Sequence, residues 1–179
     1  MPKKAAIIIG SLRKNSLNRK LAQALANLAP NLLTFDIIPL DAVPMFNQDL
    51  EANLPEPVLR LKEQVNAVDG VLFVTPEYNR GMPAVLKNTV DWCSRPTGKG
   101  VLVGKAAAIA GISPGVIGTA LAQSQLKPIL LTLGMRLMGQ PEIYIQGNDA
   151  YFDASGAIAE ARNRNFLASF VSRFADWIG

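Results

Sequence analysis

Short apolar runs alternate with helical patterns along the whole chain, and this alternation restricts the possible folds more than any other feature. Five runs have the length and composition of buried strands: 5–9, 32–38, 70–75, 105–112 and 141–147. Apolar residues at helical spacing follow each run, within 17–28, 58–68, 84–92, 118–134 and 157–178. A β-α unit repeated five times predicts an α/β protein whose parallel sheet is covered by helices on both faces.

Two doubly wound sheet orders are common for such a chain: a six-stranded order that binds dinucleotides, and the five-stranded flavodoxin-like order 2-1-3-4-5. Five predicted strands favour the flavodoxin-like order. No repeat, linker or low-complexity segment interrupts the 179 residues, so we expect a single domain over 1–179. In either order, a ligand is expected beyond the carboxyl ends of the strands, near the switch between strands 1 and 3.

The composition removes several kinds of chemistry. The chain has no histidine and one cysteine, Cys93. Ser-His-Asp and Cys-His nucleophile arrangements are therefore excluded, and neither an imidazole metal site nor a thiolate cluster is available. We expect no catalytic side chain and no metal, so that a cofactor supplies the reactivity if the protein is an enzyme.

The remaining bulk properties bear on location and partners. The net charge of +4 is small and no basic cluster accompanies it, which argues against a nucleic-acid partner. No stretch approaches the roughly 18 apolar residues of a membrane helix, and the N-terminus does not have the pattern of a signal peptide. A single cysteine fits a reducing compartment. We therefore expect a cytoplasmic protein without a membrane partner.

The loop after the first strand, 10–18, places hydroxyls, amides and a guanidinium directly before a helix. It lacks the glycine spacing of the dinucleotide fingerprint and of the Walker A loop. Its donors predict a phosphomonoester site, with the helix N-terminus behind the phosphate and Arg13 adding a charge-assisted contact. The alternative is an ordinary turn in which Ser16 or Asn18 caps the helix.

Two further loops follow strands 3 and 4. Loop 76–83 combines Tyr78, hydrogen-bonding side chains and stiffening prolines, which suits the edge of a flat heteroaromatic ligand. In loop 113–119, Ser113 can hydrogen-bond a ring carbonyl, and Gly115 lets the backbone approach a ligand closely. Each loop alone is compatible with a plain turn. Strands 1, 3 and 4 meet at the switch point of a 2-1-3-4-5 sheet, so we expect all three loops to converge.

Three motifs resemble those of the NADPH-dependent FMN reductase family, which includes bacterial quinone and chromate reductases and azoreductase-like enzymes. They are Gly-Ser-Leu-Arg-Lys-x-Ser-x-Asn at 10–18, Thr-Pro-Glu-Tyr-Asn at 75–79 and Leu-Lys-Asn-x-Val-Asp-Trp at 86–92. The resemblance implies non-covalent FMN, with its phosphate on the first motif and its ring along the second. We expect these residues to bind it: Ser11, Arg13, Ser16, Leu17, Asn18, Pro76, Glu77, Tyr78, Asn79, Ser113 and Gly115. One departure is Thr119, where many relatives carry a glycine.

The resemblance also implies an activity: passing two electrons from NADPH or NADH through FMN to a small acceptor, by a ping-pong mechanism. The acceptor expected is a quinone, a flavin, an azo compound or chromate. Arg13 and Arg80 are candidate partners for the coenzyme's 2′-phosphate. Two alternatives stay open. A flavodoxin-type electron carrier would lack a coenzyme site, although such carriers are usually acidic and this chain has a pI near 9.4. A flavin-free binding module on the same fold is the other.

The resemblance implies a homodimer or a homotetramer, and two features of the sequence agree with it. Trp92, at the end of a helix, is expected to reach a partner subunit, and Met45 with Phe46 forms an apolar pair on the long loop 41–55. Two helical stripes are expected in the core instead: Leu86, Val90 and Cys93 on one helix, and Phe166, Phe170 and Phe174 on another.

Overall fold

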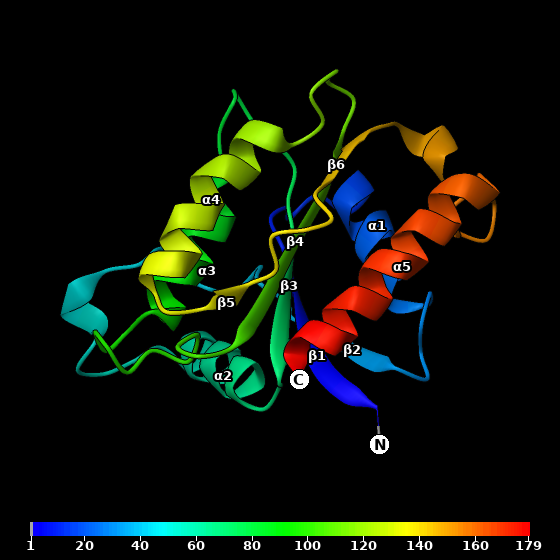
Figure 1. Ribbon diagram of the computed structural model, residues 1–179. Helices are drawn as coiled ribbons and strands as arrows, with labels where there is room; N and C mark the ends of the chain where they lie inside the picture. Colours follow the sequence, from blue (N-terminus) through cyan, green and yellow to red (C-terminus); the bar gives the residue numbers. More distant parts are fainter. Residues whose placement is uncertain (1) are drawn as a thin grey trace.

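The computed structural model describes residues 2–179 and shows a parallel sheet between two layers of helices (Figure 1). The strands are β1 Lys3–Ile9, β2 Leu33–Ile37, β3 Gly70–Val74, β4 Ala106–Ser113, β5 Arg136–Leu137 and β6 Ile143–Gln146. The α-helices are α1 Leu17–Ala26, α2 Glu56–Asn66, α3 Ala84–Cys93, α4 Ala120–Thr132 and α5 Ala161–Ile178, and two short 3-10 helices cover Gln48–Leu50 and Asp149–Tyr151.

The sheet has the order β2-β1-β3-β4-β5, with every pair parallel, which confirms the flavodoxin-like arrangement. The number of strands differs from the prediction of five, because two short strands share the last position. β5 pairs with Ala106–Ala107 of β4, and β6 pairs with the stretch from Ala110 to Ser113. Pro141 lies between these two strands and has no N–H to donate to a ladder.

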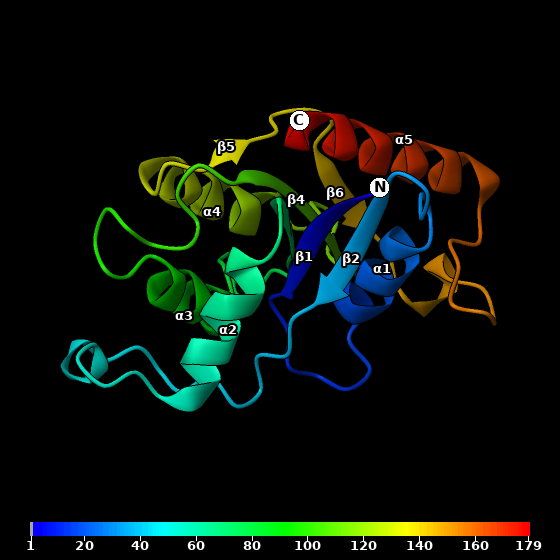
Figure 2. The same cartoon turned by 90° about the horizontal axis from the view of Figure 1, so that it is seen from below.

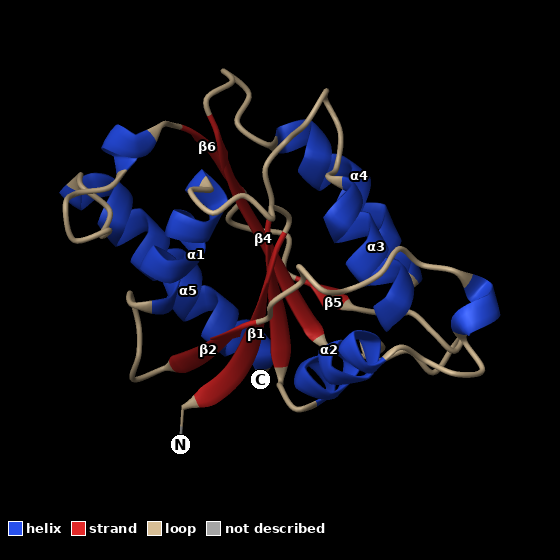
Figure 3. Ribbon diagram, turned by 180° about the vertical axis from the view of Figure 1, so that it is seen from behind, coloured by secondary structure: helices blue, strands red, loops and turns tan. Residues whose placement is uncertain are grey.

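Strand residues alternate between the two helical layers, as the period of two requires. Ala5, Ile7 and Ile9 of β1 pack with α1 and α5 on one face, and Ala6 and Ile8 pack with the core under α2, α3 and α4 on the other. Figures 2 and 3 show the two layers from below and from behind. Both faces of the central strands are therefore buried, which explains their uninterrupted apolar sequence.

The prediction that Phe166, Phe170 and Phe174 all lie in the core is wrong for one of the three. Phe170 and Phe174 of α5 are buried, but Phe166 is 50% exposed and Leu167 is buried in its place. Residues four apart on a helix are rotated by about 40° from one another, so three phenylalanines at this spacing drift off the core face. Among the described residues, no helix has both the length and the apolarity to cross a membrane.

The expectation that Trp92 reaches a partner subunit is also wrong. Trp92 is fully buried, its indole N–H donates to the Pro44 carbonyl at 2.8 Å, and its ring meets Phe46 edge-to-face at 4.9 Å. Asn88 holds the same loop, since its amide donates to Pro44 at 2.9 Å and accepts the Phe46 N–H at 2.6 Å. The third motif thus anchors loop 41–55 on α3, and only Met45 of the expected apolar pair is well exposed.

Candidate functional site

The three loops after β1, β3 and β4 meet around one narrow cleft of about 90 Å³. Its lining residues are Arg13, Ser16, Leu17, Asn18, Pro76, Glu77, Tyr78, Ile112, Ser113 and Pro114. The fold therefore contains the convergence expected from the sheet order. Ile112 and Pro114 were missed because they flank Ser113 as apolar residues without any polar signal of their own.

Three expected residues lie beside the cleft rather than in its lining. The Ser11 hydroxyl is 3.5 Å from the Tyr78 hydroxyl and accepts the Arg13 N–H at 3.4 Å, so it stands at the edge of the cleft. Gly115 donates its N–H to the Ser113 hydroxyl at 3.2 Å, which shapes the turn after β4. Asn79 lies at the exposed tip of a hairpin in loop 76–83.

The start of α1 offers unpaired donors to the cleft. Ser16 is the N-cap residue, but its side chain makes no capping hydrogen bond, and the first bond of the helix runs from the Lys20 N–H to the Ser16 carbonyl at 3.1 Å. Within residues 2–179, the N–H groups of 17–19 and the Arg13 guanidinium have no acceptor. These groups and the positive end of the helix dipole fit a phosphate. The alternative was that the side chain of Ser16 or Asn18 caps the helix. Neither side chain makes a capping hydrogen bond.

Asn18, which lines the cleft as expected of a phosphate contact, also has a structural role. Its side chain is buried, and its amide forms two hydrogen bonds with the backbone of Ile112: Nδ2 donates to the carbonyl at 2.9 Å, and Oδ1 accepts the N–H at 3.1 Å. This pair ties the first turn of α1 to the end of β4. The second N–H of this amide and the backbone N–H of Asn18 remain available to a phosphate, and Asn18 lines the cleft.

The loop after β3 forms a tight hairpin. Tyr78 and Gly81 exchange backbone hydrogen bonds of 3.1 and 2.9 Å, and the two residues between them, Asn79 and Arg80, have φ of 51° and 63°. Two successive left-handed residues make a type I′ turn, which asparagine tolerates and arginine adopts only at a cost of about 1 kcal/mol or more. Gln125 of α4 holds the turn, since it accepts the Met82 N–H at 2.9 Å and donates to the Arg80 carbonyl at 3.3 Å.

Glu77 caps α4 from outside that helix. Its Oε2 accepts the N–H groups of Leu121 and Ala122 at 2.9 and 3.1 Å, and its side chain is only 5% exposed. Thr119, the N-cap residue of α4, makes no such bond with its side chain. The carboxylate therefore lies against the positive end of a helix dipole through Oε2, while its Oε1 is 3.5 Å from the Arg80 guanidinium and Glu77 lines the cleft. It joins the loop after β3 to the helix that follows the loop after β4.

The third loop depends on close packing around Gly111. A Cβ at this position would lie 2.2 Å from the Thr119 hydroxyl and 2.3 Å from the Thr75 carbonyl. Thr119 is buried and accepts a hydrogen bond from Gln123 at 2.9 Å. Its own φ is −123°, and Gly118 supplies the left-handed residue of the turn with φ of 58°. The departure from the family pattern at Thr119 thus leaves the turn intact.

Known proteins resemble this chain over nearly its whole length. Residues 3–149 match the family described as NADPH-dependent FMN reductase. The chain is 46% identical over 178 residues to 2-hydroxy-1,4-benzoquinone reductase of a Burkholderia species, covering 99% of this chain and 97% of that protein. It is 43% identical over 174 residues to a quinone reductase of Pseudomonas putida, covering 97% and 93%. A solved flavoenzyme, the NAD(P)H:(acceptor) oxidoreductase of Paracoccus denitrificans, superimposes with a TM-score of 0.93 at 46% identity, over 98% of this chain and 97% of that one.

Proposed function

Because this chain belongs to the NADPH-dependent FMN reductase family, we propose that it passes two electrons from NADPH or NADH through bound FMN to a small acceptor. The observation that carries the proposal is the meeting of three strand-end loops at one cleft, whose phosphate end has unpaired donors. Neither alternative function accounts for the close relatives, which are named as reductases over nearly the full chain.

The residues of the cleft fit FMN. Arg13, the Ser16 hydroxyl and the N–H groups that open α1 would hold its phosphate, and Pro76, Tyr78 and Ser113 would lie along its ring. When bound, FMN supplies the redox chemistry. The chain's own contribution is to bind, orient and partly shield it. Gln125 and Glu77 hold the loop after β3 through hydrogen bonds to its backbone and to the start of α4, which would position the binding edge for the cofactor.

A quinone is the acceptor class that the site supports best. The two relatives described above are named quinone reductases. The lining of the cleft includes Pro76, Pro114 and the half-exposed ring of Tyr78, whose apolar surfaces suit a planar acceptor with few polar groups. In this proposal, coenzyme and quinone use the open face of the bound FMN ring in turn, by a ping-pong mechanism.

Initial rates with both coenzymes and a panel of acceptors test this proposal. The panel contains 1,4-benzoquinone, free FMN, an azo dye and chromate, each assayed with the FMN-loaded protein. We expect fastest turnover with the quinone and parallel double-reciprocal plots. Intersecting plots would refute the ping-pong mechanism. If neither NADPH nor NADH is oxidised with any acceptor, the protein is an electron carrier or a binding module instead.

A homo-oligomer is part of the same proposal, with a homodimer as its simplest form and a homotetramer as the alternative. Its structural support is a group of exposed apolar side chains near the cleft, with Val116 83% exposed and Leu12, Ile117 and Leu121 also exposed. Trp92 does not support an oligomer, because it is buried within the chain. Sedimentation at micromolar concentration should show a species larger than the 19.2 kDa chain, and a monomer alone would rule the oligomer out.

A cytoplasmic location is likewise proposed, in keeping with the free thiol of Cys93.

A further inference from the structure

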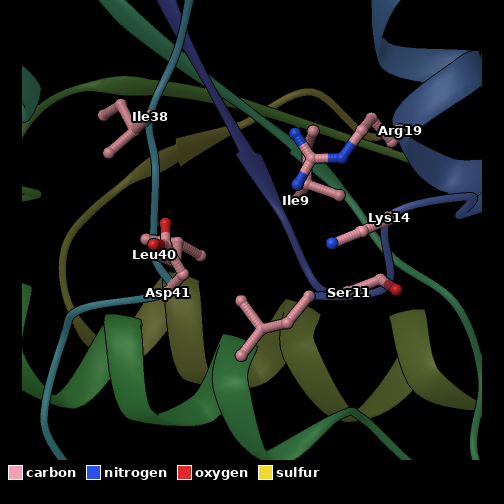
Figure 4. A pocket seen from close by; sticks show the side chains of 8 residues that line it. Ile9, Ser11, Lys14, Arg19, Ile38, Leu40 and Asp41 are labelled. Atoms are coloured by element: carbon pink, nitrogen blue, oxygen red, sulfur yellow. The ribbon is translucent and has the colours of Figure 1, made fainter.

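A second and larger cavity, of about 430 Å³, lies between the carboxyl ends of β1 and β2 (Figure 4). Its apolar lining comes from Ile9 at the end of β1, Leu12 in the next loop, and Ile38 and Leu40 beyond β2. The volume falls within the roughly 300–1,000 Å³ range of small-molecule sites. None of the side chains proposed above to contact FMN lines this cavity, and Ser11 at the edge of the cleft also borders it.

Loop 10–18 separates this cavity from the FMN cleft. Arg13, Ser16 and Leu17 line the cleft, whereas Leu12 and Lys14 line the cavity. The two spaces adjoin at Ser11, which borders the cavity and whose hydroxyl is 3.5 Å from that of Tyr78 in the cleft. A molecule that occupied the cavity would therefore lie next to the border of the FMN site.

The charged side chains of the cavity stand on two opposite walls. Lys14 and Arg19 lie on the α1 side and Asp41 on the β2 side, and all three line the same cavity (Figure 4). None of them has an ion-pair or side-chain hydrogen-bond partner in the part of the chain that the structure describes. The neighbouring Lys20, by contrast, is paired with Asp149 at 2.7 Å. Two unpaired cations across an apolar floor from an unpaired carboxylate suit a ligand with an anionic end, a flat apolar part and hydroxyl donors.

An adenosine diphosphate unit has these three parts. Its purine matches the apolar slot, its diphosphate matches Lys14 and Arg19, and its ribose hydroxyls match the carboxylate of Asp41. Dinucleotide-binding domains use a carboxylate beyond the glycine loop in this way, to accept a hydrogen bond from the ribose of NAD. We propose that the cavity binds the adenosine diphosphate half of the nicotinamide coenzyme. The inference rests on the proposed function, because it assigns a second part of the same coenzyme site.

Calorimetry tests the binding without any turnover. ADP-ribose contains the adenosine diphosphate unit but no nicotinamide, so it can be titrated into the FMN-loaded protein. We expect it to bind, and we expect Lys14→Ala and Arg19→Ala each to weaken it about tenfold, as for the loss of a charge-assisted hydrogen bond. FMN affinity should fall less than ADP-ribose affinity in both variants, because both side chains line the cavity and not the cleft. Arg162→Ala is the control, because Arg162 also lies in the first turn of a helix and is exposed.

Two results of this titration would overturn the assignment. If inorganic pyrophosphate binds as tightly as ADP-ribose, the cavity is a bare cation site and no adenosine is recognised. If Lys14→Ala and Arg19→Ala bind ADP-ribose as well as Arg162→Ala does, the ligand lies elsewhere.

Inhibition and coenzyme preference test the assignment to the coenzyme. ADP-ribose should inhibit competitively against NADH or NADPH, and a non-competitive pattern would show a separate nucleotide site instead. Asp41→Asn should shift the preference towards NADPH about fivefold, because the carboxylate repels a 2′-phosphate. An unchanged preference would contradict the ribose contact. Failure of the wild-type protein to oxidise either coenzyme would refute the proposed function, whereas normal oxidation with unchanged KM in Lys14→Ala and Arg19→Ala would refute this inference alone.

Discussion

Replacing Glu77 by alanine should destabilise the fold and loosen the FMN cleft together. The carboxylate is 5% exposed and accepts two N–H groups at the start of α4, at 2.9 and 3.1 Å. Loss of a capping side chain costs about 0.5–2 kcal/mol, and loss of a negative charge at a partly buried helix N-terminus costs up to about 2 kcal/mol more. We expect about 2 kcal/mol for Glu77→Ala, equivalent to a fall of about 4–8 °C in Tm for a domain of this size.

Glu77→Gln separates the two contributions, because glutamine keeps an oxygen acceptor and loses the charge. It should cost about 0.5–1 kcal/mol, between the wild type and the alanine variant. Thermal unfolding followed by circular dichroism measures both changes, and FMN titration should rank the affinities in the same order. The matched control is Glu63→Ala, since Glu63 is an exposed carboxylate on α2. If Glu77→Ala and Glu63→Ala have the same Tm, Glu77 is not the cap of α4.

The remaining predictions concern the phosphate, the thiol and the packing of the third loop. Arg13→Ala should weaken FMN by about 1.5 kcal/mol, roughly tenfold, and leave riboflavin binding unchanged in a fluorescence titration; an equal loss for riboflavin would refute the phosphate contact. Burial raises the pKa of the Cys93 thiol to about 12, against the opposing effect of Lys62, so the free energy of unfolding should fall as pH rises from about 9 to 12. Denaturant melts should show that slope, and Cys93→Ala should lack it. Gly111→Ala should lower the free energy of unfolding measured in urea by about 1–3 kcal/mol through steric overlap, whereas Gly139→Ala, whose Cβ meets open space, should not.

The sheet was predictable because its strands are buried on both faces. An uninterrupted run such as 70–75 leaves little alternative to a central parallel strand, and the order 2-1-3-4-5 then places three loops together. β5 was not predictable, since two residues carry no periodicity and gain their strand geometry from β4 alone. The prediction that Phe166 is buried was wrong for a related reason, because a spacing of four residues alone does not fix which helix face is buried.

The site was predictable at the level of loops but less so at the level of side chains. The donors before α1 are local in sequence, so their unpaired state followed from the loop itself. Glu77 and Asn18 look like ligand contacts in the sequence, yet their partners are backbone groups 44 and 94 residues away. Trp92 likewise contacts Pro44, 48 residues away. Long-range partners of this kind depend on the packed fold and leave no mark in the local pattern.

The central claim is that bound FMN takes electrons from the coenzyme and gives them to a small acceptor, and two anaerobic half-reactions test it most directly. The FMN-loaded protein is mixed first with NADPH or NADH and then with 1,4-benzoquinone, while the absorbance of the oxidised flavin is followed. We predict that one equivalent of coenzyme removes this absorbance and one equivalent of quinone restores it. A flavin absorbance that neither coenzyme changes, or that the quinone does not restore, would contradict the claim.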